Sequence, residues 1–239
     1  LTAATNTLRG DITTADVAAN NVTITGAVTL ASGVTIDTNR TTNKGDITIT
    51  GASTGAGTAL SLTGKTISTG TITTTGAANG DGGAVNITGS STVTIGAITT
   101  TGGTATAGNA GRDAGAISVS GAGVTLAGIS ASGSAGVTTG DRAGGSGAAV
   151  NITSTNGITQ TGAFTASGGN GVNNGAGGNA GSITVSNSGA GNISVGALTA
   201  STGNAAGTGL GGTVGSISVS NTFAGGNVTT AALTTTGGT

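Results

Sequence analysis

The sequence contains no cysteine, histidine, proline, methionine, tryptophan or tyrosine, and its seven acidic residues are all aspartate. The absence of cysteine excludes a disulfide framework and a thiolate metal site. The absence of histidine removes the most common general base and transition-metal ligand. Only 5% of the residues are charged, and the six basic residues are scattered, whereas nucleic-acid binding needs clustered positive charge. We therefore expect no cofactor, no metal, no catalytic residues and no nucleic-acid partner.

Long apolar runs are also missing, so we expect no membrane-spanning helix. The chain begins at Leu1 and shows no signal peptide, from which we expect a processed or excised piece of a longer protein. Glycine, by contrast, supplies 51 of the 239 residues, three times its average usage of about 7%. Collagen is excluded because the glycines have no period of three and proline is absent.

Val, Ile and Thr recur with a regular spacing that argues against disorder. Apolar residues alternate with Thr, Ser or Asn in short groups, which is typical of strands with one buried face. The first members of successive groups lie 32, 33, 33 and 34 residues apart, and they are Val85, Ile117, Val150, Ile183 and Ile217. A fixed period of this size indicates a solenoid.

The pattern predicts an all-β fold, a right-handed parallel β-helix of about 33 residues per repeat. Each coil is expected to contain three short strands and a glycine-rich loop. Alternation alone leaves an up-and-down or sandwich fold open. Residues 1–46 are expected to form irregular N-terminal coils. Residues 47–239 are expected to form regular repeats, with boundaries at 47–84, 85–116, 117–149, 150–182, 183–216 and 217–239.

Two columns of equivalent residues should carry the structure. The inward position of the third strand is apolar in every repeat and predicts a core column of Ile72, Ile98, Ile129, Phe164, Leu198 and Leu233. The position four residues before the first strand is polar and predicts a turn column of Asp81, Asp113, Ser146, Asn179 and Thr213. Phe223, the only other aromatic residue, is also expected in the core.

The glycine-rich segments, such as 102–115 and 168–181, should lie together along one edge of the stack. Solenoids often use such insertions as binding surfaces. Alternatively, these segments fold as a further uncharged wall or stay mobile.

Several stretches resemble the repeat regions of filamentous-haemagglutinin-like adhesins, the large bacterial surface proteins of the two-partner secretion and autotransporter type. The similar stretches are residues 33–39 (GVTIDTN), 43–51 (NKGDITITG), 178–185 (GNAGSITV), 192–195 (NISV) and 197–200 (ALTA). The resemblance implies a parallel β-helix at the outer surface of a Gram-negative-type cell, with a role in adhesion, aggregation or a biofilm matrix. The chain lacks the asparagine–proline motifs of the family's secretion domain, so it would be a stalk segment.

Weaker patterns suggest other sites. Arg9-Gly10-Asp11 spells a tripeptide that some host receptors recognise, although it can equally be a charged pair at a frayed terminus. Asp37 and Asp46 could approach one another across a turn, but no aromatic sugar platform accompanies them, which argues against glycoside hydrolysis. Outward Thr and Ser recur on the third strand, as on the ice-binding face of some antifreeze solenoids. The other outward columns are similar, so β-propensity and solubility explain them as well.

We therefore expect a non-enzymatic structural segment of an extracellular adhesin or matrix fibre. A self-assembling filament subunit joined end to end is the alternative, and an ice-binding solenoid is the third. The expected partners are further coils of the same chain or copies of itself, with cell-surface glycans or host receptors as additional candidates.

Overall fold

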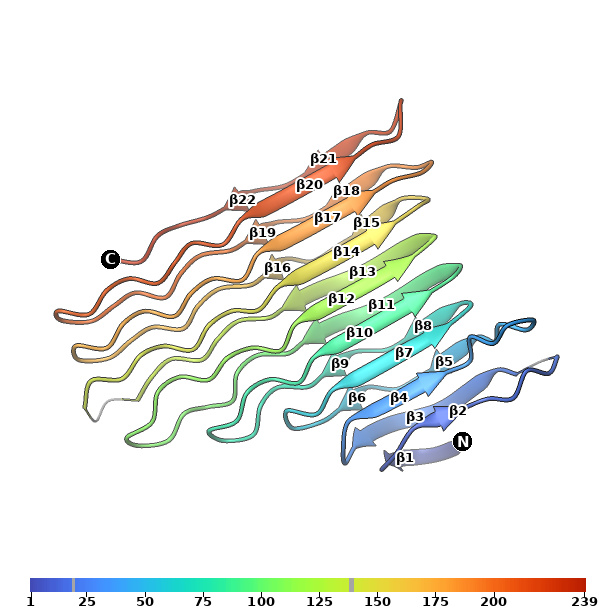
Figure 1. Cartoon of the computed structure of the whole chain (residues 1–239), viewed down its shortest axis with the longest axis horizontal. Coiled ribbons are helices and arrows are strands. Elements are labelled where there is room, and N and C mark those ends of the chain that lie inside the picture. Colours follow the sequence, from blue (N-terminus) through green and yellow to red (C-terminus); the bar gives the residue numbers. More distant parts are fainter. Residues whose placement is uncertain (19, 138–139) are drawn as a thin grey trace.

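The computed structural model describes residues 1–18, 20–137 and 140–239. Strands and connecting segments make up this part of the chain, and it contains no helix. Successive coils stack from the N-terminal to the C-terminal end, and long connecting segments reach out to one side (Figure 1). The expected all-β class is confirmed, and the parallel arrangement described below is that of a β-solenoid.

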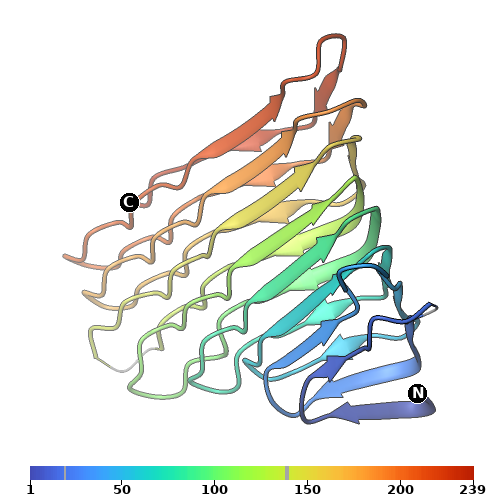
Figure 2. The same ribbon diagram turned by 45° about the vertical axis from the view of Figure 1, so that its right-hand side comes forward.

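The strands form two parallel sheets. The fourteen-stranded sheet comprises β1 (Thr2–Leu8), β3 (Val22–Leu30), β5 (Ile47–Ile49), β6 (Ser53–Thr54), β8 (Ile67–Thr69), β9 (Ile72–Thr73), β11 (Thr92–Thr99), β13 (Gly123–Ser130), β15 (Ile158–Gln160), β16 (Phe164–Thr165), β18 (Ile193–Val195), β19 (Leu198–Thr199), β21 (Val228–Thr230) and β22 (Leu233–Thr234). The eight-stranded sheet comprises β2 (Ile12–Thr13), β4 (Val34–Asp37), β7 (Leu60–Gly64), β10 (Val85–Gly89), β12 (Ile117–Gly121), β14 (Val150–Ser154), β17 (Ile183–Asn187) and β20 (Ile217–Asn221). Figure 2 shows the two sheets facing one another.

The register of the eight-stranded sheet joins equivalent residues of neighbouring coils. Val85 pairs with Ile117, Ile117 with Val150, Val150 with Ile183, and Ile183 with Ile217. Like therefore stacks on like, and each interior strand satisfies its backbone groups on both sides. The apolar side chains that alternate inward from both sheets form one continuous buried core.

The second and third expected strands of each coil belong to one sheet. In β11 they are a single continuous strand, and Ala97 between them pairs with Gly128 of β13. Strict alternation would place Thr94 and Thr99 on opposite faces, because they are five residues apart. Both face outward because the alternation is interrupted at Gly96 and Ala97, which are both half-buried. A small Gly-Ala step thus turns the chain without breaking the ladder, and the coil has two sheets instead of three separate strand faces.

Candidate interaction surfaces

The core column lies in one line through the fourteen-stranded sheet. Ile72 pairs with Ile98, Ile98 with Ile129, Ile129 with Phe164, Phe164 with Leu198, and Leu198 with Leu233. The first five residues are buried, and Phe164 is fully enclosed. Leu233 is in register but 52% exposed, because no described coil covers its far side. Leu233 thus departs from the burial of the other members because it lies in the last described coil, although its register is that of the column.

Phe223 also departs from the expectation, since it is 41% exposed. It lies in the connection between β20 and β21, where Gly226 N–H donates to the Phe223 carbonyl in a turn. The turn fixes this backbone outside both sheets, so the ring cannot reach the core.

The turn column joins each coil to the next. The Asp81 carboxylate accepts from the Asp113 N–H at 3.1 Å, and the Asp113 carboxylate accepts from the Ser146 N–H at 2.6 Å. The Asn179 side-chain oxygen accepts from the Thr213 N–H at 2.7 Å. A backbone hydrogen bond joins the coils at every step of the column, and between Ser146 and Asn179 it is the bond from Gly147 N–H to the Asn179 carbonyl. The side chains of Asp81, Asp113 and Asn179 therefore accept hydrogen bonds from the backbone of the next coil.

The glycine-rich segments form a close-packed layer, which we call the glycine slab; it consists of residues 74–83, 100–115, 131–137, 140–148, 166–181 and 200–215. Segments that follow a third strand alternate in this layer with segments that lead back to a first strand. Backbone N–H groups donate to backbone carbonyls across the layer, from Gly203 to Gly178, from Gly178 to Gly169, from Gly169 to Gly145 and from Gly145 to Ser134. A Cβ atom on Gly145, Gly178 or Gly212 would strike a backbone carbonyl of the preceding coil. At these three positions the backbones pack directly on one another, and a side chain larger than hydrogen would separate them.

Buried threonines lie at the place where the core meets the glycine slab, which we call the neck. The apolar pattern did not identify them. The Thr74 hydroxyl donates to the Gly83 carbonyl at 2.6 Å, and the Thr100 hydroxyl donates to the Gly115 carbonyl at 2.5 Å. Thr38 makes a similar bond to Gly45 at 2.7 Å in an earlier coil, but at the opposite end, in the turn from β4 to β5. The inward position of the middle residue in each Thr-Thr-Thr run was the available signal, because alternation points it into the interior.

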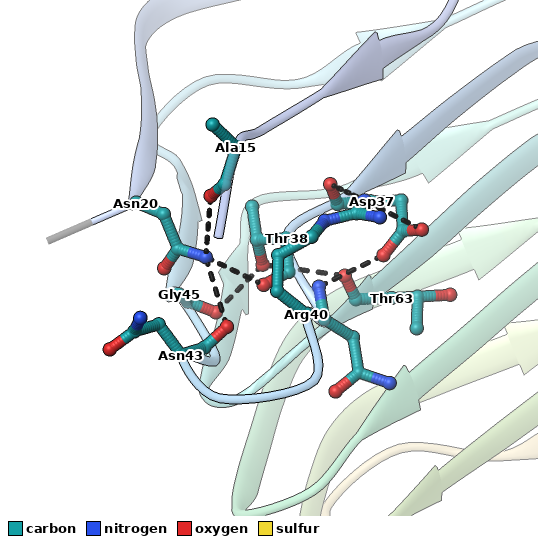
Figure 3. Close-up of polar contacts among 9 residues, drawn as sticks. Ala15, Asn20, Asp37, Thr38, Arg40, Asn43, Gly45 and Thr63 are labelled. Atoms are coloured by element: carbon teal, nitrogen blue, oxygen red, sulfur yellow. Dashed lines mark hydrogen bonds and ion pairs between the residues drawn. The ribbon is translucent and has the colours of Figure 1, made fainter. Parts of the chain in front are cut away.

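A polar cluster lies at the opposite end of the N-terminal coils (Figure 3). The buried Asn20 amide donates to the carbonyls of Ala15, Thr38 and Asn43 at 3.4, 3.2 and 3.1 Å. Nearby, Arg40 forms an ion pair with Asp37 at 2.8 Å. The cluster borders an open groove of about 410 Å³ lined by Asn20, Asn21, Thr42, Asn43, Lys44, Lys65, Ser90 and Ser91. The groove is polar and offers hydrogen-bond donors without an aromatic ring.

The Asp16 carboxylate holds the turn beside this groove. The backbone N–H groups of Asn43 and Thr42 donate to it at 2.8 and 3.0 Å, and these bonds lower the pKa of Asp16 below its ordinary value of 3.8. A lowered pKa means that the ionised form favours the folded turn, so this contribution is present above pH 3.8 and is lost as the pH falls through the lowered value.

We therefore expect the amide resonances of Thr42 and Asn43 to titrate together with a midpoint below pH 3.8 in an NMR pH series. Asp16→Asn keeps an acceptor oxygen but cannot ionise, so this titration should disappear in that variant. A midpoint at or above 3.8 would contradict the assignment of these bonds.

The remaining suggested sites are placed as follows. Arg9, Gly10 and Asp11 are exposed in the connection from β1 to β2, and the Asp11 carboxylate accepts from the Thr35 N–H at 2.7 Å. Asp37 is engaged by Arg40, and Asp46 accepts from the Thr66 N–H at 3.1 Å. Among the described residues no group of three or more acidic side chains could hold a metal ion, and no helix could cross a membrane.

In comparisons with known proteins, no family model, curated protein or solved structure matches this chain.

Proposed function

We propose that this chain is a structural segment of an extracellular adhesin or matrix fibre, which projects a functional tip or supports cell aggregation. The observation that carries the proposal is the ladder of parallel strands running from coil to coil in both sheets. Each ladder bond lies along the stack, so tension on the stack is shared among the many bonds at each coil boundary. Length by repetition is the useful property of such a molecule.

The finer architecture forms part of the proposal. Right-handed winding is favoured because about 98% of parallel crossover connections in a sheet are right-handed. A repeat of about 33 residues is supported by the paired positions in β10, β12, β14, β17 and β20. The location outside a bacterial cell rests on the resemblance of the repeats to those of bacterial surface adhesins, and the outward Thr, Ser and Asn side chains give the stack a polar surface.

The partners that fit this role are further coils of the same chain. Cell-surface glycans or host receptors would meet the polar groove beside Asn20, the slab or the exposed Arg9-Gly10-Asp11 segment. The bond from Thr35 N–H to Asp11 counts against the last of these, because the Asp11 carboxylate is already engaged within the chain.

The test removes codons 1–239 in frame from the gene of the producing cell and measures cell clumping and surface labelling. We expect surface-exposed antigen in the parent strain and loss of clumping on deletion. A matched variant lacks only residues 85–149, which joins position 84 to Val150 and preserves the register of Val85. It should fold and be shorter by two strand spacings, about 10 Å, in small-angle scattering. Antigen confined to the cell interior, or unchanged clumping without the segment, would overturn the proposal.

A self-assembling subunit joined end to end is the second candidate, and it would bury apolar side chains of the final described coil. Val228 and Leu233 are 45% and 52% exposed, although they continue columns that are buried in earlier coils. Either a further coil or another copy of the chain could cover them. Sedimentation velocity at rising concentration distinguishes the two: fibres support self-assembly, whereas a constant monomer counts against it.

A further inference from the structure

The outer face of the fourteen-stranded sheet carries two rows of hydroxyl groups in register, which we call the threonine rows. The strand-two row is Thr23, Thr48, Ser68, Thr94, Thr125, Thr159, Ser194 and Thr229. The strand-three row is Thr7, Thr29, Thr54, Thr73, Thr99, Ser130, Thr165, Thr199 and Thr234. The ladder pairs every residue with the next in its row, so each row runs straight along the stack.

The opposite sheet differs in composition. Its fifteen outward residues comprise six threonines, six serines, Asn86, Asn151 and Asp37, whereas the two threonine rows contain fourteen threonines among seventeen residues. Strand propensity and solubility act equally on both sheets and would not concentrate threonine on one of them. The sequence did not reveal the contrast, because the two rows appear to belong to separate strands until the structure places them in one sheet.

The hydroxyl groups of the strand-two row are available to a ligand. Thr94, Thr125 and Thr159 are exposed, and their hydroxyls make no hydrogen bond to any residue that the structure describes. Threonine is β-branched and has few rotamers, so each hydroxyl and methyl group is held in a restricted orientation. No strand of this sheet contains a charged residue, so no tightly hydrated ion interrupts the face.

We propose that the threonine rows bind the surface of ice. Strand spacing repeats the hydroxyl and methyl groups every 4.7–4.9 Å, roughly the strand separation in any sheet, and this period is close to that of oxygen atoms along the a axis of hexagonal ice. A rigid row of this period can hold water molecules in lattice positions and merge with a growing crystal. The ligand is therefore crystalline water, a function distinct from the structural role proposed above.

The test measures thermal hysteresis and crystal shape with the whole chain in a nanolitre osmometer. The unmodified chain should stop growth below the melting point and produce faceted crystals. Thr94→Lys/Thr159→Lys places two charged, flexible side chains in the strand-two row and should abolish both effects. Thr88→Lys/Thr153→Lys makes the same changes at exposed positions of β10 and β14, in the same two coils but on the other sheet, and should keep both effects.

Circular dichroism establishes whether each variant retains the fold. If the lysine pair disrupts it, Thr94→Ser/Thr159→Ser keeps the hydroxyls, removes the methyl groups and should lower the hysteresis. The proposal is overturned if the unmodified chain shows no hysteresis and no crystal shaping, or if the two lysine pairs reduce the activity equally. Neither result would affect the structural role, which is tested by clumping and surface labelling.

Discussion

Gly178→Ala should destabilise the protein by about 3 kcal/mol, the upper part of the usual range for overpacking a close-packed site. Gly178 is buried in the glycine slab, and a Cβ atom there would collide with the Gly145 carbonyl of the preceding coil. The same carbonyl accepts the Gly169 N–H. The collision therefore involves backbone that is already bonded, and no flexible side chain can move aside to relieve it.

Gly123→Ala is the matched control. Gly123 lies in β13, and an added Cβ atom there meets nothing within 4 Å. Because alanine restricts the unfolded chain, this change should stabilise the protein by about 0.5 kcal/mol. Urea denaturation followed by circular dichroism measures both variants. Equal midpoints would show that the slab is an open loop in solution, because only a close-packed slab distinguishes these two glycines.

The sequence allowed the strand register to be anticipated, since alternation and spacing both repeat. Val85, Ile117 and Val150 could be aligned from their spacing, and the structure pairs them. A register error of one residue would turn every apolar side chain of a strand outward, which is why so short a pattern is informative. Core positions such as Ile98 follow from the same argument.

The glycine slab could not be anticipated in the same way. Glycine-rich sequence is compatible with a mobile loop, a turn or a packed wall, because glycine has no side chain whose burial would produce a pattern. The distinction depends on contacts between coils, such as the bond from Gly203 to Gly178. The threonine neck bonds were missed for a related reason: Thr74 and Thr100 are inward but polar, so an apolar pattern does not include them.

The turn between the first and second strands shows why Phe223 was misplaced. Val93 follows Val85 by eight residues, whereas Val228 follows Ile217 by eleven. The additional residues form a longer turn, and Phe223 falls within it. Hydrophobicity alone assigned this ring to the core, but the position of its backbone decides the outcome.

Phe164→Ala should cause the largest loss of stability, about 3–5 kcal/mol, as is typical for truncating a fully buried phenylalanine. Phe164 is completely enclosed between Ile129 and Leu198 of the neighbouring coils. The ladders on both sides fix the strand spacing, so these coils cannot collapse into the cavity that the ring leaves. Phe223→Ala makes the same chemical change at a 41% exposed turn position and should stay within about 0.5 kcal/mol.

Because each coil is stabilised by its neighbours, the loss of stability caused by Phe164→Ala should be greatest near the substituted coil. Native-state hydrogen exchange should show the greatest loss of protection in β16 and in its partners β13 and β19, decreasing toward β3. A uniform loss across the chain would indicate that all coils unfold as one unit, so stability would not be transmitted from neighbour to neighbour. Equal denaturation midpoints for Phe164→Ala and Phe223→Ala would contradict the core column itself. The two phenylalanines are the only aromatic residues in the chain, so this pair separates burial from residue type.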